Sequence, residues 1–361
     1  MQLMSHLVPV WLIFGGQSPE HDISISSART AAQHLNKERY AVRPVYIRRD
    51  GDWAVAEELL NPADDVAAVI ADLTQREGMN PGAAMAKAHD EAVAAALLIL
   101  HGACGEDGTI QGMLEMNRIQ YTGSGVLASS LSMDKVRCQQ FLRGYGMPVA
   151  DSVHNEDAQQ NAAALTEQAL QRIGLPCVVK PSRAGSSVGI SIVKEEQKLL
   201  PAIQQAAQID RIVMVEKFVA GRELTCGVIE QWNDGRCERR AMPVTEIRPK
   251  NSEFFDFKAK YTAGESEEIT PAPIDAETTA LVQQLAQKAF GAVGCRDMAR
   301  VDFILSPESG PHILEINTIP GLTPTSLLPQ QASHVGISFG QLLEIFVENA
   351  IARSTRMPQA D

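Results

Sequence analysis

Apolar and polar positions along the first hundred residues follow two alternating periods, which predict strands and helices in turn. Short apolar runs at Val8–Phe14, Val42–Ile47 and Ala96–His101 are typical of buried strands. Between the first two runs, the apolar positions of Ile23–Leu35 recur at helical spacing. This order of strand, helix and strand predicts a parallel sheet. The polar, alanine-rich residues 50–90 fit neither period and receive no assignment.

The pattern changes after residue 124, where short strands between helices predict a small α+β region. Two helices are expected, one over Val126–Tyr145, ending near Gly146 and Pro148, and one over Gln159–Ile173. Strands are expected at Cys177–Lys180, Ile190–Val193 and Ile212–Val219, with a glycine- and serine-rich loop at Pro181–Gly189.

The last third of the chain mixes strands, polar stretches and helices. We expect a strand near 223–230, a variable turn at 231–240, a long polar stretch at 245–270, a helix at 276–290, a hairpin at 299–317 and a helix near 339–352.

Length, charge and cysteine usage restrict the classes of protein that fit. A chain of 361 residues is too long for one ordinary core, so two or three domains are expected. The net charge of -12 predicts repulsion of nucleic acid and anionic lipid. The six cysteines form no C-x-x-C pair, and we interpret them as free thiols in a reducing cytosol. The apolar run at Leu7–Phe14 lacks the basic flank of a signal peptide, and no run has the length of a transmembrane helix.

The predicted hairpin places charged and amide side chains at every second position. If its turn is centred between residues 308 and 309, Asp302 lies opposite Glu315 and Arg300 opposite Asn317. Side chains two residues apart share one face of a strand, so all four project together. Two carboxylates and an amide oxygen suit Mg²⁺, and an adjacent guanidinium suits a phosphate or a developing negative charge.

A solvated face of salt-bridged charges explains the hairpin pattern equally well. The segment that follows, Thr318–Ser326, favours the functional interpretation. Its prolines and Gly321 end the strand and begin a loop rich in hydroxyls and free backbone N–H groups, where a carboxylate could bind.

Two glycine-containing loops are further candidates. In the loop at Pro181–Gly189, Gly185 permits close approach of a ligand, and Ser186 and Ser187 offer donors to phosphate oxygens. Taken alone, this loop is explained more simply as a flexible hairpin loop. The second loop, Gly15–Ser24, follows the first strand and opens a helix, a position suited to an anion or an amine. From position alone, Glu20 in this loop is expected to cap the helix. Neither loop has the pattern of a Walker A or a dinucleotide-binding motif.

Short blocks of polar and glycine residues follow one another along the chain: Gly15-Gly-x-Ser-x-Glu-His, His101-Gly-x-x-Gly-Glu-Asp-Gly-Thr-Ile-Gln-Gly, Tyr121-Thr-Gly-Ser-Gly, Met133-Asp-Lys135, Lys180-Pro-Ser-x-x-Gly-Ser-Ser-Val-Gly189, Glu216-Lys217, Gly221-Arg-Glu223, Phe257-Lys-Ala-Lys-Tyr261, Arg300-x-Asp302 and Glu315-Ile-Asn-Thr-x-Pro-Gly321. In this order, the blocks resemble D-alanine–D-alanine ligases of the ATP-grasp superfamily. They span roughly residues 13–329, and their joint order and spacing are specific where each block alone is weak.

The resemblance implies an α/β and α+β chain with the ATP-grasp fold, in which a Rossmann-like N-terminal domain precedes two α+β domains that clamp ATP. The expected domains are 1–124 for substrate, 125–217 as the small central ATP-grasp domain, and 218–361 with the magnesium site and a lid loop at about 245–270.

The resemblance also implies an activity and its partners. The chain is expected to ligate two D-alanines to D-alanyl-D-alanine through a D-alanyl phosphate, releasing ADP and phosphate, for peptidoglycan precursors. ATP is a substrate, two Mg²⁺ ions are expected, and Mn²⁺ can replace them. The expected setting is a cytoplasmic homodimer without nucleic-acid or membrane partners.

By motif position, the resemblance assigns four groups of residues. The catalytic group is Glu20, Ser186, Arg300, Tyr261 and Gly321; the substrate-binding group is Glu20, His101, Lys260, Ser326 and Leu327; the ATP-binding group is Lys135, Lys180, Ser187, Glu216, Lys217, Val219, Glu223 and Asn317; and the metal ligands are Asp302, Glu315 and Asn317.

Other functions compete with this one. An ATP-grasp ligase with D-lactate or D-serine as acceptor has the same motifs; Tyr261 argues against lactate, whereas D-serine stays open. A catalytically silent nucleotide-binding protein is disfavoured by the intact set of predicted catalytic residues. A Rossmann oxidoreductase ranks last because the glycine fingerprint is missing.

Overall fold

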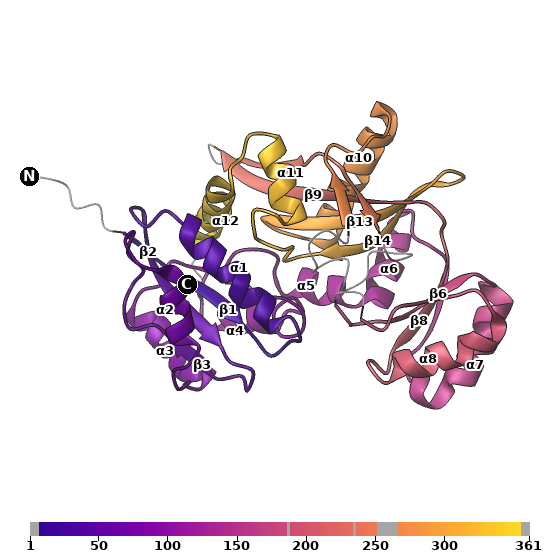
Figure 1. Ribbon diagram of the computed structural model, residues 1–361, viewed down its shortest axis with the longest axis horizontal. Helices are drawn as coiled ribbons and strands as arrows, with labels where there is room; N and C mark the ends of the chain where they lie inside the picture. Colours follow the sequence, from indigo (N-terminus) through magenta and orange to yellow (C-terminus); the bar gives the residue numbers. More distant parts are fainter. Residues whose placement is uncertain (1–6, 186–187, 234–235, 251–265, 355–361) are drawn as a thin grey trace, which may run out of the picture.

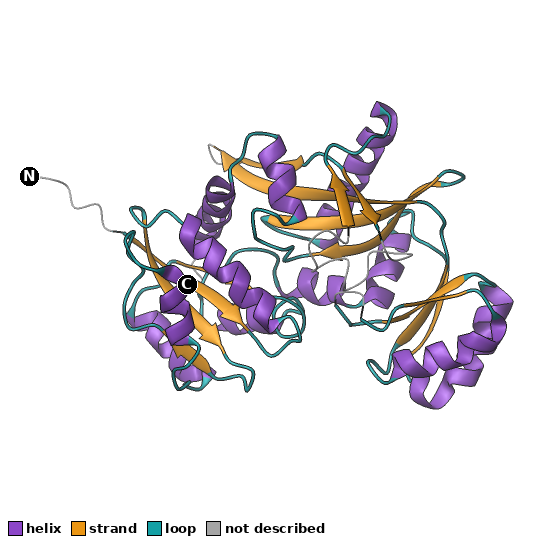
Figure 2. Cartoon of the chain, in the orientation of Figure 1, coloured by secondary structure: helices purple, strands orange, loops and turns teal. Residues whose placement is uncertain are grey.

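The computed structural model describes residues 7–185, 188–233, 236–250 and 266–354 and contains three sheets (Figure 1). A four-stranded sheet with its helices occupies one end of the molecule, and a second four-stranded sheet with two helices occupies the other (Figure 2). The six-stranded sheet lies between them.

The first sheet has the order β3-β2-β1-β4. Strand β1 pairs in parallel with both β2 and β4, so the predicted parallel sheet is confirmed, and β3 adds an antiparallel edge from the unassigned segment. The elements of this region are β1 (Val8–Gly15), α1 (His21–His34), β2 (Tyr40–Ile47), β3 (Trp53–Val55), α2 (Val66–Leu73), α3 (Pro81–Asp90), β4 (Ala95–Ile99) and α4 (Thr109–Met116).

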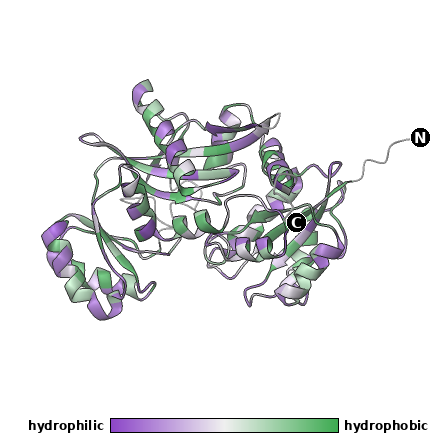
Figure 3. Cartoon of the chain, turned by 180° about the vertical axis from the view of Figure 1, so that it is seen from behind, coloured by the Kyte–Doolittle hydropathy of each residue, from purple (hydrophilic) through white to green (hydrophobic). Residues whose placement is uncertain are grey.

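Both faces of the first sheet are buried, which explains its uninterrupted apolar strands. Leu12 and Phe14 on β1 pack with α1 and α2, while Trp11 and Ile13 pack with α3 and α4. The first of these faces is also covered by Phe346 from α12 (Phe339–Ser354), a helix from the far end of the described chain. Seen from behind in Figure 3, the strands of this sheet are coloured mainly as hydrophobic.

One predicted helix is in fact two. Residues Val126–Met133 form α5 and Lys135–Gly144 form α6, because Asp134 leaves the helical conformation with φ −89° and ψ 97°. Its carboxylate accepts a hydrogen bond from the backbone N–H of Arg137, as an N-cap aspartate does. The single helix expected over Val126–Tyr145 is therefore wrong, and the break places Lys135 at a helix start.

The second sheet is antiparallel and has helices on one face only. Cys177 and Val179 on β6 pack with Val213 and Val215 on β8 and with the helices. Val178 and Lys180 on β6 face the opposite side. The elements are β5 (Ser152–Asn155), α7 (Ala158–Arg172), β6 (Cys177–Pro181), β7 (Ser191–Val193), a 3-10 turn at Glu196–Lys198, α8 (Leu199–Ala207) and β8 (Val213–Lys217), in the sheet order β5-β8-β6-β7.

The third sheet has the order β12-β11-β9-β13-β14, and β10 pairs with β9. The variable turn expected at 231–240 is wrong in extent, because β9 and β10 continue through most of it as a hairpin. The polar stretch at 245–270 likewise begins and ends in strands, and residues 251–265 lie outside the described chain. The elements are β9 (Arg222–Asn233), β10 (Arg236–Ala241), β11 (Thr245–Pro249), β12 (Ser266–Ile269), α10 (Ala276–Val293), β13 (Met298–Ser306), β14 (Gly310–Asn317) and α11 (Leu327–His334).

The register predicted for the carboxylate hairpin is confirmed. Asp302 pairs with Glu315 and Arg300 pairs with Asn317. Nearer the turn the register differs by one residue, and a bulge at Leu314 restores it. Without this extra residue, the register near the turn would continue, and Asp302 would not lie opposite Glu315.

No single helix in the described ranges is long and apolar enough to cross a membrane; only α11 and α12 taken together pass that test, and they are bent by 105°.

A buried ion pair ties α12 to the junction between the first and third sheets. Asp297, with no exposed surface, accepts two hydrogen bonds from Arg353 at 2.5 and 2.9 Å and one from the backbone N–H of Gly123 at 2.7 Å. Arg353 also donates to the carbonyl of Tyr121. The pair therefore joins three segments that are far apart in sequence.

We expect Arg353→Ala to lower the free energy of unfolding by about 3–5 kcal/mol, because it leaves the Asp297 carboxylate buried without its cation. Urea unfolding followed by circular dichroism measures the loss. Lys198→Ala is the control, since the Lys198–Glu195 pair is exposed and contributes less than about 1 kcal/mol. Equal small losses in both variants would contradict the role given to Arg353.

Candidate functional site

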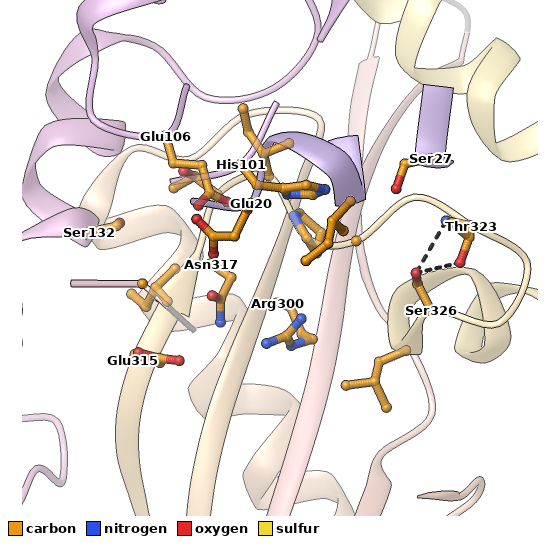
Figure 4. A pocket seen from close by; sticks show the side chains of 18 of the residues that line it. Glu20, Ser27, His101, Glu106, Ser132, Arg300, Glu315, Asn317, Thr323 and Ser326 are labelled. Carbon is orange, nitrogen blue, oxygen red and sulfur yellow. Dashed lines mark hydrogen bonds between the residues drawn. The ribbon is translucent and has the colours of Figure 1, made fainter. Parts of the chain in front are cut away.

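The largest candidate site is a cavity of about 580 Å³ where the carboxyl ends of β1 and β4 face the carboxylate hairpin. In α/β folds, ligands bind outside the carboxyl ends of parallel strands. Figure 4 shows Glu20, His101 and Glu106 on one side of the cavity, with Arg300, Glu315 and Asn317 facing them. The segment 318–327 completes the wall through Thr318, Ile319, Pro320, Gly321, Thr323, Thr325, Ser326 and Leu327.

A second, smaller cavity of about 120 Å³ lies between the bare face of the second sheet and the hairpin of the third. Its lining combines apolar side chains, which suit a flat ring, with charged side chains. Lys135 and Glu315 line both cavities, so the two spaces meet at the hairpin. The predicted ATP-binding residues that line the smaller cavity are Lys135, Lys180, Glu216, Lys217, Val219 and Glu223.

The side chain of Asp302 accepts four hydrogen bonds. Its Oδ1 accepts from Arg300 Nε at 2.9 Å and from Thr225 Oγ1 at 2.6 Å, and its Oδ2 accepts from Arg300 Nη2 at 2.8 Å and from Asn317 Nδ2 at 2.9 Å. Only 5% of the residue is exposed. A buried carboxylate needs such partners, and here a guanidinium balances its charge.

The two lysines predicted to meet phosphates are paired with carboxylates. Lys180, 8% exposed, forms an ion pair with Glu216, which also accepts from Gln139 at 2.8 Å. Lys135 lies 3.3 Å from Glu315 and donates to the carbonyl of Ala184 at 2.9 Å. Lys135 thus lies where the two cavities meet, and Lys180 lies in the wall of the smaller cavity.

The helix-capping role expected for Glu20 is wrong. The residue occupies the N-cap position of α1, but its side chain makes no capping hydrogen bond and instead lies in the wall of the large cavity, 6% exposed. Two glycines leave room for this carboxylate. A Cβ atom on Gly185 would lie 3.1 Å from Glu20 Oε1, and one on Gly102 would overlap Oε2.

Burial sets the protonation of two cavity residues on the loop after β4. Burial, and then the positive charge of Arg300, lower the pKa of His101 to about 4. Burial, and then the nearby Glu20 carboxylate, raise the pKa of Glu106 to about 8. Near neutral pH both side chains are therefore uncharged, and the cavity wall contains a neutral imidazole and a protonated carboxyl group.

The loop before α11 brings hydroxyls to the opposite end of the cavity. Ser326 precedes the first residue of α11, and its Oγ accepts from the Thr323 backbone N–H at 3.2 Å and lies 2.8 Å from Thr323 Oγ1. Gly321 lies so near that an added Cβ would be 2.8 Å from this oxygen. One small region of the cavity wall therefore contains the predicted catalytic residue Gly321 and the predicted substrate-binding residues Ser326 and Leu327.

The hairpin residues fit a magnesium ion by their chemistry. Within the described ranges, no group of three or more His, Cys, Asp or Glu side chains converges in a manner suited to a metal. The set is instead two carboxylates and the amide of Asn317, whose nitrogen donates a hydrogen bond to Asp302 and whose oxygen can serve as a metal ligand. Mg²⁺ is usually bound by one or two carboxylates together with substrate phosphates.

The structure brings most of the predicted site residues together around the two cavities. Ser186, Ser187, Lys260 and Tyr261 lie outside the described residues. Sequence reasoning missed Glu106, Thr225 and Glu268 as cavity or network residues. A signal existed only for Glu106, which stands inside the quoted motif that begins at His101.

Comparisons with known proteins agree along nearly the whole chain. The family models described as the D-ala D-ala ligase N-terminus and C-terminus match residues 9–124 and 141–348. A D-alanine–D-alanine ligase from Bacillus pumilus is 36% identical over 96% of this chain and 96% of its own length.

Two solved structures are similar in fold. The VanG D-Ala:D-Ser ligase from Enterococcus faecalis has a TM-score of 0.79 at 30% identity, covering 95% of this chain and 99% of its own. The D-alanine–D-alanine ligase from Coxiella burnetii has a TM-score of 0.78 at 27% identity, covering 97% and 95%. The expected ATP-grasp fold is confirmed.

The raised pKa of Glu106 predicts a pH-dependent stability. Between its ordinary value of 4.5 and about 8, the folded chain keeps a proton that the unfolded chain has released. The free energy of unfolding therefore falls as the pH rises through this window. Glu106→Gln lacks this titration, so the stability of the wild type relative to the variant should fall by about 2 kcal/mol between roughly pH 6.5 and 8.

Urea unfolding of both proteins across this range measures the difference. His101 does not complicate the comparison, because its lowered pKa affects stability mainly below its ordinary value of 6.5 and does so in both proteins. Parallel pH profiles for the two proteins would show that Glu106 is ionised in the folded state at neutral pH.

Proposed function

The chain belongs to the D-alanine–D-alanine ligase family, and on this premise we propose that it joins two D-alanines to D-alanyl-D-alanine, with conversion of ATP to ADP and phosphate, for peptidoglycan precursors. The observation that carries the proposal is the meeting of an apolar, ring-sized cavity with a polar cavity at one carboxylate hairpin. Such an arrangement brings a nucleotide's phosphates next to a small polar substrate.

The first step transfers the γ-phosphoryl group to the carboxylate of the first D-alanine. Glu20 holds the ammonium group of this substrate, and the adenine occupies the smaller cavity. Lys135 and Lys180 exchange their carboxylate partners for phosphate oxygens. Positioning and charge compensation provide most of the catalysis of phosphoryl transfer. The products of this step are D-alanyl phosphate and ADP.

Asp302, Glu315 and Asn317 hold Mg²⁺ in this proposal, with Mn²⁺ as a substitute. When bound, the metal offsets the negative charge that develops on the phosphate oxygens. The residues contribute hard oxygen ligands and a fixed spacing, since all three lie on one face of β13 and β14.

The second step joins the two amino acids. The neutral amine of the second D-alanine attacks the acyl carbon, one of its N–H protons passes to the departing phosphate, and inorganic phosphate leaves with the electrons of the C–O bond. Arg300 and the backbone N–H of Gly321 stabilise the oxyanion of the tetrahedral intermediate. Ser326 holds the carboxylate of the second D-alanine, and Leu327 packs beside it.

The remaining roles stay predictions from the family resemblance. Ser186 and Tyr261 complete a hydrogen-bonded triad with Glu20, Ser187 binds phosphate, and Lys260 binds substrate; all but Glu20 lie outside the described residues. The lid at 245–270, the domain limits at residues 124 and 217, a homodimer and a cytoplasmic location belong to the same group.

D-serine is the second candidate acceptor, because one similar structure is a D-Ala:D-Ser ligase. The two amino acids differ by one hydroxyl, and the polar wall of the large cavity, which includes Thr323 and Ser326, offers hydrogen-bond partners to that hydroxyl.

Phosphate release by the purified chain with Mg-ATP, with products identified by mass, tests the proposal. D-Alanine alone should give phosphate and D-alanyl-D-alanine, whereas L-alanine should give neither. D-Alanine with D-serine or D-lactate measures the acceptor preference, and D-alanyl-D-serine as the main product would favour the second candidate. ATP binding without release in any mixture would exclude the ligase function.

Gly102→Ala tests the position of Glu20. The added methyl overlaps the Glu20 carboxylate, so the KM for D-alanine should rise at least about 10-fold, the effect of losing one charged contact. Gly146→Ala is a matched control, because Gly146 has φ +67°, close to the +68° of Gly102, and nothing within 4 Å of an added Cβ. Both variants share the backbone strain, so only a KM change specific to Gly102→Ala supports the role of Glu20.

A further inference from the structure

We propose that Gln331 on α11 is a positioning residue for the metal ligand Asp302, and that it acts through Thr225 on β9. The inference deepens the proposed function, because it assumes that Asp302 binds the catalytic cation. It identifies two residues that none of the motifs singled out. It also connects the region around Ser326, where the second D-alanine binds in the proposed function, with the metal ligand Asp302.

The starting point is a gap along one edge of β9. Strand β11 pairs with β9 up to Thr225, and β10 pairs with it only from Val228 onward. Gly227 lies between these points, and within the described residues no paired strand provides an acceptor for its backbone N–H. Buried backbone groups without partners are costly, so this gap must be filled.

The side chain of Gln331 fills the gap. Its Oε1 accepts from Gly227 N at 2.9 Å, and its Nε2 donates to Thr225 O at 3.1 Å and to Thr245 Oγ1 at 3.0 Å. The amide thus takes the place of a peptide group of a neighbouring strand. Gln331 has no exposed surface, and both of its N–H donors have acceptors.

The fit is tight on the strand side as well. A Cβ atom on Gly227 would lie 2.7 Å from Gln331 Oε1, so only glycine permits this approach. Thr245 is also held, because its hydroxyl lies 2.6 Å from Thr270 Oγ1. The position of Thr225 along β9 is therefore fixed from the α11 side.

Thr225 transmits this position to Asp302. The two residues are cross-strand partners on β9 and β13, and Thr225 Oγ1 donates to Asp302 Oδ1 at 2.6 Å. Thr225 has no exposed surface, so water does not replace this hydroxyl. Groups that hydrogen-bond to metal-binding side chains orient them and raise metal affinity.

The other end of the connection is the acceptor region. Helix α11 begins directly after Ser326, whose hydroxyl faces the large cavity, and Gln331 stands five residues further along the same helix. A short helix is a rigid connector. Helix α11 therefore positions both the residue that contacts the second substrate, Ser326, and the side chain that orients the metal ligand Asp302.

Metal affinity tests the proposal without any need for turnover. The probe is Mn²⁺ titrated into the full chain with ADP, with free Mn²⁺ measured by electron paramagnetic resonance. Thr225→Val keeps the shape and removes the hydroxyl, so Mn²⁺ affinity should fall about 10-fold or more. Thr225→Ser restores the donor and should restore most of the affinity.

Gln331→Met should also weaken Mn²⁺ binding, and the double variant with Thr225→Val should be no weaker than Thr225→Val alone, because both act along one path. Thr122→Val is the matched control: Thr122 is equally buried beside the first sheet, where its hydroxyl accepts from Leu98 N on β4 at 3.1 Å. It should lose stability and keep the wild-type Mn²⁺ affinity.

The outcomes separate this proposal from the proposed function. Wild-type Mn²⁺ affinity in folded Thr225→Val or Gln331→Met, or additive effects in the double variant, overturns the positioning role. If Gln331→Met does not fold, Gln331→Asn keeps an amide that is too short to span the gap, and the same criterion applies to it. Absence of dipeptide synthesis by the wild type would overturn the ligase function alone, because the Mn²⁺ measurements use no D-alanine.

Discussion

The buried charge of Asp302 is the constraint on which the arrangement of the site depends. A carboxylate that is almost wholly removed from water must be surrounded by donors. This one receives them from three strands: Thr225 on β9, Arg300 on its own strand β13, and Asn317 on β14. Because one carboxylate needs donors from all three strands, it fixes how the strands are aligned. It also determines the face of the sheet from which the neighbouring side chains project toward a substrate.

The two cavities follow from how the sheets are covered. The first sheet is buried on both faces, so its chemistry is confined to the loops at its carboxyl edge, where Glu20 and His101 lie. The second sheet has helices on one face, and its bare face forms a wall of the smaller cavity through Lys180 and Glu216. The hairpin of β13 and β14 contributes to both spaces, which is why Glu315 lines each of them.

Most of the fold and the pairing of the hairpin could be predicted from the sequence, because both rest on strict periodicity. Alternation placed Asp302 opposite Glu315, and apolar runs located β1, β2 and β4. The bulge at Leu314 could not be predicted, since nothing in the local sequence marks an extra residue between the two alternating runs. The break at Asp134 had a local signal, a capping aspartate, but the apolar pattern on both sides concealed it.

The candidate site was predictable only where a residue belonged to a motif. The capping role predicted for Glu20 from its position was wrong. The burial of its side chain depends on Gly102 and Gly185, which come from other parts of the chain. Gln331 and Thr225 are ordinary polar residues in ordinary elements. What distinguishes them is a missing strand partner on β9, and that is a property of three-dimensional pairing.

The coverage of the first sheet by α12 has a consequence for the order of events on the ribosome. The strands β1, β2 and β4 are made early, yet Phe346 and its neighbours on α12 complete one face of their core. Helix α12 begins 240 residues after the end of β4, and at about 5–20 residues per second the ribosome needs roughly 12–48 s to make them. During that interval the apolar face that includes Leu12 and Phe14 is only partly covered by α1 and α2. The nascent chain is thus exposed to association with chaperones, or with other unfinished chains, until α12 is made.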